Sequence, residues 1–134
     1  MYQSSFGTAF GKLILRLTVG GLMLFHGVHK ILHPESLNFI SSSLEAAGLP
    51  TFLTYGVFVG EVLAPLLIIF GVLSRLGGLL IMINMIFAIA LAHSADLLAL
   101  TPHGGWRLEL QAFYLLGGLA IFSMGSGRFA LKRD

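Results

Sequence analysis

The chain has 134 residues, and Lys, Arg, Asp and Glu together make up only 10% of them, whereas a soluble globular domain carries roughly 25% charged residues. Hydrophobic residues make up 56% of the sequence and the mean hydropathy is +0.90, so there is too little polar surface to cover a water-soluble particle. The composition therefore excludes a soluble monomer, a disordered chain and a nucleic-acid-binding module, and it indicates a lipid bilayer as the surrounding medium.

Four long apolar stretches follow one another along the chain, each close to the roughly 20 residues that a helix needs to cross a hydrocarbon core. They lie near residues 11–32, 52–73, 76–98 and 106–124. Short connectors join the last three stretches, which is typical of helices that pack against their sequence neighbours. The sequence therefore predicts an all-α fold with one domain over residues 1–134, an antiparallel bundle of four transmembrane helices.

The connector between the first two stretches, residues 33–50, is the only long one and has a pattern of its own. Pro34 suits the first position of a helix, and Gly48-Leu49-Pro50 ends the pattern. Between them, three apolar residues recur at helical spacing: Leu37, Ile40 and Leu44. Such an amphipathic pattern predicts a short helix that lies at the membrane interface between spans 1 and 2.

Positively charged residues are distributed unequally between the two ends of the predicted bundle. With four spans, both chain termini share a side with the turn at residues 74–75. This side holds five cations near the span ends, namely Lys12, Arg75, Arg128, Lys132 and Arg133. The opposite side holds Lys30 and Arg107. Because cytoplasmic span ends carry an excess of Lys and Arg, we expect both termini in the cytoplasm and the long connector outside.

Polar and ionisable side chains inside the spans are costly, so their depth is informative. At about 1.5 Å per residue, Glu61 and Asn84 fall near the middle of the membrane, and Arg16 lies one turn inside the inner end. Three further groups fall nearer the outer ends of their spans: His26, His93 and Glu109. The polar groups are thus expected to concentrate in the outer half of the bundle.

Helical phase indicates which of these groups can face one point. His26 and Lys30 differ by about 40° on the first span and share a stripe. Asn84 and His93 are nine residues apart on the third span, about 180° around a straight helix. Either one of them serves another contact, or the helix bends.

Glu61 has an unusual sequence neighbourhood. Gly56, Gly60 and Ala64 form a ladder of small residues that lets helices approach closely in lipid. Pro65 lacks a backbone N–H, so the carbonyl of Glu61 loses its helical partner and the helix can kink there. The sequence therefore predicts a locally opened helix beside a buried carboxylate, which is a plausible binding site.

Several short motifs follow one another in a particular order over these spans. They are Arg16, His26-Gly27-xx-Lys30, Ala47-Gly48-Leu49-Pro50, Gly60-Glu61, Gly71-xxx-Arg75, His93, Glu109 and Gly125-Ser126-Gly127-Arg128. Their order and spacing resemble the DoxX family of small bacterial membrane proteins. The resemblance implies a four-helix protein of the bacterial inner membrane. It also implies, in some members, association with quinone-linked sulfur oxidation and, in others, with oxidative-stress complexes.

Three classes of function are compatible with these residues. In the first, a redox-associated membrane subunit, His26 and Lys30 hydrogen-bond a quinone carbonyl and Glu61 moves the accompanying proton. Glu61 and His26 are then the candidate catalytic residues. The candidate ligand-binding set is Arg16, His26, Lys30, Glu61, Asn84, His93 and Glu109. The alternatives are a proton-coupled carrier of a small or lipophilic solute, in which Glu61 titrates, and a non-catalytic membrane scaffold. The resemblance favours the first class.

Each candidate also has a structural interpretation. Glu61 can serve as a buried carboxylate hydrogen-bonded across helices, and Arg16 and Lys30 as interfacial cations that reach the head groups. The sequence has no cysteine and no visible nucleotide, flavin or haem motif, so whether the chain is an enzyme on its own stays open. A quinone is the cofactor that the resemblance suggests, and a soluble or membrane-bound redox partner would complete the activity.

A metal site has one apparent signal, the spacing of His26-xx-His29-xxx-His33 on successive turns. Pro34 interrupts the helix there, and only His26 belongs to the family-like pattern, so no metal is expected. The fourth stretch carries aromatic and glycine residues on more than one face, which is more than packing against one neighbouring helix requires. This excess predicts a homo-oligomer.

Overall fold

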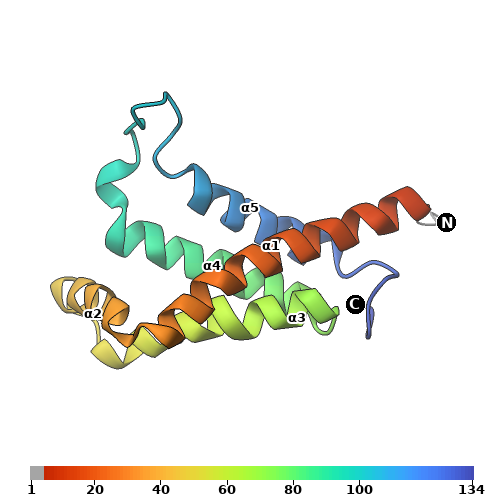
Figure 1. Ribbon diagram of the computed structural model, residues 1–134, viewed down its shortest axis with the longest axis horizontal. Helices are drawn as coiled ribbons and strands as arrows, with labels where there is room; N and C mark the ends of the chain where they lie inside the picture. Colours follow the sequence, from red (N-terminus) through yellow and green to blue (C-terminus); the bar gives the residue numbers. More distant parts are fainter. Residues whose placement is uncertain (1–4) are drawn as a thin grey trace.

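The computed structural model of the protein describes residues 5–134, and helices account for most of them (Figure 1). The expected all-α fold is confirmed, since no strand forms within residues 5–134. Three helical stretches are long and apolar enough to cross a membrane: Phe6–Leu32, Thr51–Phe70 and Ser74–Ala92. The last helix, α5 (Glu109–Met124), is apolar but has only 16 residues. The fourth span and the antiparallel four-span bundle therefore stay predictions.

The first helix, α1 (Phe6–Leu32), has recognisable start and stop signals. The Ser5 hydroxyl accepts a hydrogen bond from the backbone N–H of Thr8 at 3.1 Å, which satisfies one of the donors that a helix start leaves free. The helix ends just before His33 because the residue that precedes a proline disfavours helical geometry.

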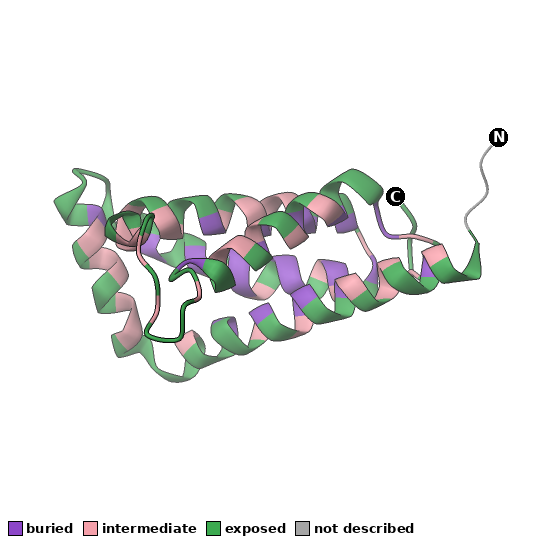
Figure 2. Ribbon diagram, turned by 90° about the horizontal axis from the view of Figure 1, so that it is seen from above, coloured by how far each residue is buried: buried purple, intermediate pink, exposed green. Residues whose placement is uncertain are grey.

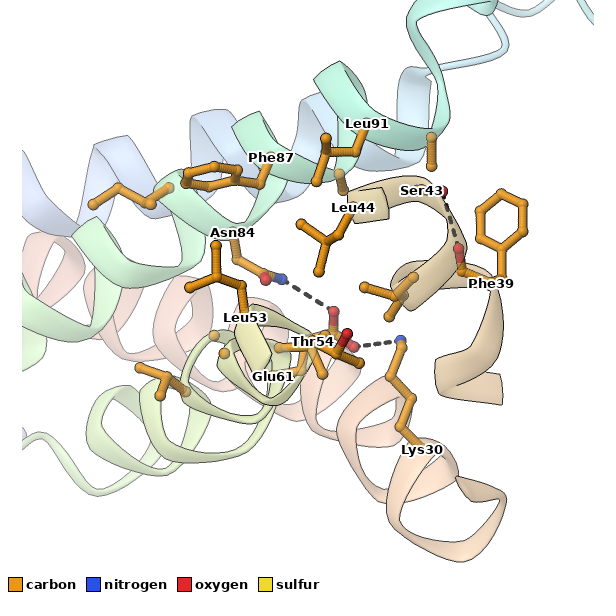
Figure 3. A pocket seen from close by; sticks show the side chains of 18 of the residues that line it. Lys30, Phe39, Ser43, Leu44, Leu53, Thr54, Glu61, Asn84, Phe87 and Leu91 are labelled. Carbon is orange, nitrogen blue, oxygen red and sulfur yellow. Dashed lines mark hydrogen bonds and ion pairs between the residues drawn. The ribbon is translucent and has the colours of Figure 1, made fainter. Parts of the chain in front are cut away.

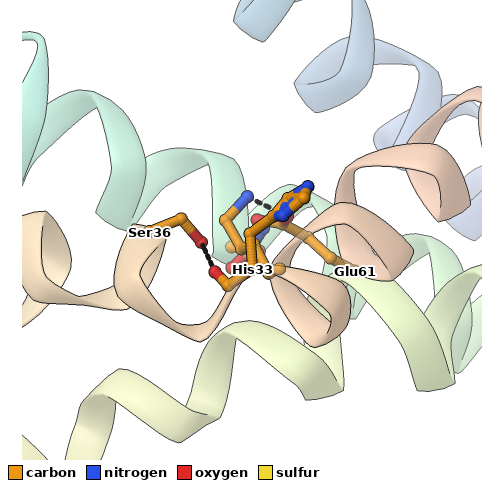
Figure 4. A network of polar contacts seen from close by, with 5 residues as sticks. His33, Ser36 and Glu61 are labelled. Carbon is orange, nitrogen blue, oxygen red and sulfur yellow. Dashed lines mark hydrogen bonds and ion pairs between the residues drawn. The ribbon is translucent and has the colours of Figure 1, made fainter.

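The connector after α1 contains a short 3₁₀ turn, η1 (Pro34–Ser36), followed by α2 (Leu37–Ala46). The Ser36 hydroxyl donates to the carbonyl oxygen of His33 at 2.7 Å and closes the corner between the two helices (Figure 4). Gly48, with a φ of 75°, terminates α2 in the left-handed region, where glycine carries no steric penalty. The short helix predicted in the connector is confirmed, and its place at the membrane interface stays a prediction.

The second membrane-length stretch changes its helical form along its length. It begins as a 3₁₀ helix, η2 (Thr51–Gly56), passes through a π-helical turn, η3 (Val59–Leu63), and continues as α3 (Ala64–Phe70). Pro65 has no N–H to donate to the carbonyl of Glu61, so the regular pattern of hydrogen bonds four residues back fails at this point. Backbone N–H groups here instead donate to the carbonyl five residues earlier, as Ala64 does to Val59. The local opening predicted beside Glu61 is therefore a π turn, a feature that is frequent at functional sites.

The third stretch, α4 (Ser74–Ala92), follows α3 after a tight turn and ends earlier than the sequence predicted. The expectation of a helix as far as residue 98 is wrong. At His93 the backbone leaves the helix, and a 3₁₀ turn, η4 (Ser94–Asp96), follows it. Serine and aspartate favour such turns because their side chains compete for nearby backbone groups. The apolar residues beyond the turn lie in a loop, and Leu98 is 98% exposed.

The end of the chain packs back onto the helices. α4 and α5 approach closely where Gly78 and Gly118 face one another, since a Cβ on either would meet the carbonyl of the other. After α5 the tail, residues 125–134, runs beside the end of α3, where the Leu131 N–H donates to the Phe70 carbonyl at 3.2 Å. Figure 1 shows the start of α1 and the C-terminus at one end of the molecule and α2 at the other.

Burial follows the inner faces of the helices (Figure 2). The core consists of apolar residues from α1, α3, α4 and α5: Val19, Met23, Ala64, Ile68, Ile81, Met85, Tyr114 and Ile121. The outer faces carry large exposed apolar side chains, such as Phe25 and Phe113. Exposed apolar faces of this extent are expected where lipid replaces water.

Candidate functional site

The buried carboxylate of Glu61 lies at the centre of the polar contacts between helices (Figure 3). The ammonium of Lys30, on α1, donates to its Oε1 at 2.6 Å. The amide of Asn84, on α4, donates to its Oε2 at 3.0 Å. Glu61 is only 6% exposed, and a charge this buried is tolerated only when it is paired and hydrogen-bonded. Each oxygen of the Glu61 carboxylate has a donor, and one of the two donors is a cation.

Close backbone packing brings these three side chains together. Gly27 of α1 lies directly against the backbone carbonyl of Glu61, so that a Cβ at Gly27 would overlap it. Gly60 packs against the side chain of Asn84 in the same way. Small residues at such crossings let helices approach closely in lipid. Of the predicted small-residue ladder, Gly60 and Ala64 are buried as expected, whereas Gly56 is exposed.

A cavity of about 570 Å³ opens beside the carboxylate, between α2, η2, η3 and α4. Its walls are mainly apolar, with Leu44 from α2 and Phe87 and Leu91 from α4 around the opening in Figure 3. Seven polar residues also line it: Lys30, Ser36, Ser43, Thr54, Glu61, Asn84 and His93. A mainly apolar pocket of this size with a few convergent polar groups is typical of a small-molecule site.

A second cavity, of about 200 Å³, lies between α1, α4 and α5. His26, Gln111 and Tyr114 line it, and the His26 ring meets the Tyr114 ring edge to face with centroids 5.8 Å apart. Four residues line both cavities: Lys30, Glu61, Ala88 and His93. The Lys30–Glu61 ion pair therefore forms part of the wall between them.

Asn84, on α4, and His93, just after it, were expected to face opposite directions if the helix is straight. Both nevertheless line the larger cavity. They do so because α4 ends at Ala92, and His93 has the non-helical φ of −130°. His93 also lies beside Asp96, with 3.7 Å between His93 Nδ1 and Asp96 Oδ2, so it serves another contact as well, which was the first of the two alternatives.

Arg16, another predicted site residue, lines neither cavity and is 1% exposed. Its guanidinium donates four hydrogen bonds to backbone carbonyls. The acceptors are Ile68 at 2.8 Å, Ile69 at 3.3 Å, Ser126 at 3.0 Å and Phe129 at 2.5 Å. Arg16 thus ties α1 to the carboxyl end of α3 and to the C-terminal tail. The structure does not bring it to Glu61.

Glu109 also lies apart from the others. It is the first residue of α5, it is exposed, and it lines neither cavity. Of the predicted set, the structure therefore gathers Lys30, Glu61, Asn84 and His93 around the larger cavity and places His26 in the smaller one.

The histidines near the end of α1 do not assemble a metal site in the structure. His29 and His33 meet edge to face with ring centroids 4.4 Å apart, and both are exposed. Residues 5–134 contain no group of three or more His, Cys, Asp or Glu side chains placed to hold a metal ion.

Several residues of the cavity walls were not identified from the sequence, among them Gln111, Tyr114 and Thr54. Gln111 and Tyr114 are three residues apart on α5, a spacing that puts both on one face of a helix. Their polarity in an otherwise apolar helix was the signal that could have identified them. Thr54 is buried and shares a hydrogen bond of 2.8 Å with Ser41, which joins η2 to α2. No local pattern in the sequence indicates that pair.

Together, three apolar helices of membrane length and a buried ion pair between two cavities define a small helical membrane protein with an internal polar centre. The chain belongs to the DoxX family, which it matches over residues 11–94. The family recognised from the sequence motifs is therefore confirmed. The matched region contains every predicted site residue except Glu109.

The chain is also similar to two known proteins. The chain is 30% identical over 135 residues to "Uncharacterized membrane protein Rv3486" of Mycobacterium tuberculosis (strain ATCC 25618 / H37Rv), across 90% of this chain and 78% of that protein. It is 32% identical over 80 residues to "Putative oxidoreductase CatD" of Bacillus subtilis (strain 168), across 59% of this chain and 57% of that protein. No solved structure matches this chain.

Proposed function

We propose that this DoxX protein binds a small lipophilic molecule with hydrogen-bond-accepting carbonyls, a quinone, in the larger cavity and acts as a redox-associated subunit of the bacterial inner membrane. The observation that carries the proposal is the buried Glu61 carboxylate, held by Lys30 at 2.6 Å and Asn84 at 3.0 Å, in the wall of a mainly apolar cavity of about 570 Å³. The name of the Bacillus subtilis relative, "Putative oxidoreductase CatD", supports the redox assignment.

The donor set of the cavity fits a quinone. An ammonium has three N–H donors and an amide has two, and Glu61 accepts one from each of Lys30 and Asn84. The remaining donors are available to a carbonyl oxygen. The apolar side chains of α2 and α4 supply the surroundings that a ring and a lipid-like tail require.

A bound quinone would supply two-electron and proton chemistry in the membrane. The residues of this chain bind and orient it, exclude bulk water and hold a proton. In this arrangement Lys30 and Asn84 are the ligand donors, and Glu61 is the group that accepts or releases the proton beside them. His26 lines only the smaller cavity, so the carbonyl-donor role expected of His26 passes to Asn84.

The membrane arrangement proposed with this function has four spans, including α5, in an antiparallel bundle with both termini in the cytoplasm. More cations lie at the span ends on the side of the two termini than on the opposite side, and this asymmetry supports the orientation. The start of α1 and the C-terminus lie at the same end of the molecule (Figure 1), as an even number of spans requires.

The decisive experiment is a calorimetric titration of the purified protein in mild detergent with a short-chain ubiquinone. Wild type should bind saturably, and Asn84→Leu, which removes a donor and keeps the branched shape of the side chain, should weaken binding by about tenfold. Asn38→Leu is the matched control because Asn38 is exposed on α2 and lines neither cavity. Absence of saturable binding in wild type, or equal affinity in Asn84→Leu, would contradict the proposal.

A proton-coupled carrier is the second candidate, because the Lys30–Glu61 pair lines both cavities. A carrier would show uptake of a solute driven by a pH gradient in liposomes that contain only this protein. Neutralising the carboxylate, in Glu61→Gln, would abolish this uptake. A quinone-binding subunit would show no such flux.

A further inference from the structure

The smaller cavity differs in chemistry from the larger one. Six of its ten lining residues carry polar or ionisable groups: His26, Lys30, Glu61, His93, Gln111 and Tyr114. The apolar residues among them include Met23 and Met85, which are deeply buried. The cavity therefore reaches from buried Met23 and Met85 to exposed His26 and Leu110, and its walls offer several donors and acceptors.

Gln111 gives the most direct evidence of what this cavity holds. Its side-chain carbonyl oxygen, Oε1, is shielded from the surface and has no hydrogen-bond partner within residues 5–134. A buried acceptor without a donor is destabilising, and native proteins normally satisfy such groups with protein or with ordered water. Gln111 lines the smaller cavity, and rotation of its amide by 180° about the terminal bond, which exchanges the positions of oxygen and nitrogen, would present the oxygen to a donor in that cavity.

We infer that the smaller cavity is a water-filled chamber, that Gln111 anchors its water, and that this chamber is the route by which Glu61 exchanges protons with the aqueous phase. A volume of about 200 Å³ accommodates several water molecules, since one water molecule needs roughly 15 Å³ and several polar partners. The Tyr114 hydroxyl, the Gln111 amide and the His26 ring supply those partners.

The position of the chamber gives it this role. Glu61 lies in the wall between the two cavities, so it faces the mainly apolar cavity and the polar chamber together. A carboxylate placed in this way can meet a lipophilic ligand on one side while water reaches it on the other. The hydration of the chamber stands independently of any ligand, and only its role as a proton route rests on the proposed function.

Cysteine accessibility tests the chamber directly, because the chain has no native cysteine. Met85→Cys places a thiol in the smaller cavity only, at a position that is 6% exposed. Phe113→Cys is the matched control on α5, at a position that is 77% exposed but lines neither cavity. Both variants are reconstituted in vesicles of mixed orientation and treated with a charged methanethiosulfonate, which reacts with thiols that water reaches.

The buried Met85→Cys thiol should react at least tenfold faster than the Phe113→Cys thiol, although the latter has far more exposed surface. A lipophilic maleimide should reverse the order. Adding Gln111→Leu to Met85→Cys should slow the charged reagent several-fold, whereas Gln111→Glu, which retains acceptor oxygens, should restore the rate. Circular dichroism and gel filtration of each variant exclude misfolding as the cause.

Reaction of Met85→Cys no faster than Phe113→Cys would overturn the inference, as would a rate that Gln111→Leu leaves unchanged. If Met85→Cys fails to fold, Met23→Cys provides the same measurement, since Met23 is 1% exposed and lines the smaller cavity and not the larger one. The labelling needs no quinone. A chamber that labels as expected in a protein that binds no quinone would therefore refute the proposed function and leave the hydrated chamber standing.

Discussion

Gly27 of α1 packs against the backbone carbonyl of Glu61, in the π turn that Pro65 imposes. This contact sets the separation of α1 from the second stretch. Lys30 is three residues further along α1, on nearly the same face of the helix. The close approach at Gly27 therefore lets the Lys30 ammonium come within 2.6 Å of the carboxylate.

Gly27→Ala should destabilise the protein and separate the ion pair. A methyl group there would overlap the Glu61 carbonyl, and overpacking of this kind costs about 1–3 kcal/mol. Gly21→Ala is the control, because a Cβ at Gly21 has no atom within 4 Å and alanine favours the helix. Thermal unfolding in detergent should show a lower Tm for Gly27→Ala and an unchanged or higher Tm for Gly21→Ala. Equal Tm values for the two variants would contradict the packing described here.

Lys30 and Glu61 should be strongly coupled in stability. Breaking a buried ion pair by removing one partner costs roughly 3–5 kcal/mol, because a buried charge is left unpaired. The loss should be smaller here, since the Lys30 side chain is 20% exposed. Lys30→Met should therefore lower the Tm, and the double variant Lys30→Met/Glu61→Gln should recover part of the loss. A double-mutant cycle measures the coupling, and additive losses would show that the pair contributes little.

Arg16→Lys should loosen the C-terminal tail. A lysine ammonium is compact and cannot reach the four carbonyls that the planar guanidinium of Arg16 contacts. Hydrogen bonds to a charged group contribute about 1.5–3 kcal/mol each, so losing even one should lower the Tm by roughly 5–10 °C. Limited proteolysis should also cut the tail faster. Arg128→Lys is the control, because Arg128 is exposed and stacks over the Phe129 ring. If the tail resists proteolysis equally in both variants, the hydrogen bonds of Arg16 do not hold it in place.

The proposed orientation predicts which positions react from outside intact cells. Single cysteines at Ser42 and His103, which are exposed on α2 and in the loop before α5, should be labelled by an impermeant reagent. A cysteine at Leu131, exposed in the tail, should be labelled only after the membrane is opened. The opposite pattern would reverse the orientation. Labelling of both His103 and Leu131 from outside would mean that α5 does not cross the membrane.

Several features of the protein follow from sequence alone. The low charge and high hydropathy predicted a membrane protein, and the order of short motifs predicted the DoxX family. Pro65 predicted the opened helix beside Glu61, since a missing N–H removes a backbone hydrogen bond whatever surrounds it. Glu61 itself was identifiable because a carboxylate inside an apolar span needs a partner. All of these depend on local chemistry.

Tertiary structure decided which polar residues meet. Arg16 and Lys30 are both cations on α1. Arg16 donates hydrogen bonds to backbone carbonyls, such as that of Ile68, whereas Lys30 pairs with Glu61. Asn84 and His93 share a cavity although their spacing on a straight helix would separate them, and α4 ends at Ala92, between the two residues. Gln111 and Tyr114 join the site because α5 packs beside α1 and α4 around the second cavity. These arrangements depend on where glycines let helices approach, and on contacts between residues far apart in the chain, which helical periodicity does not encode.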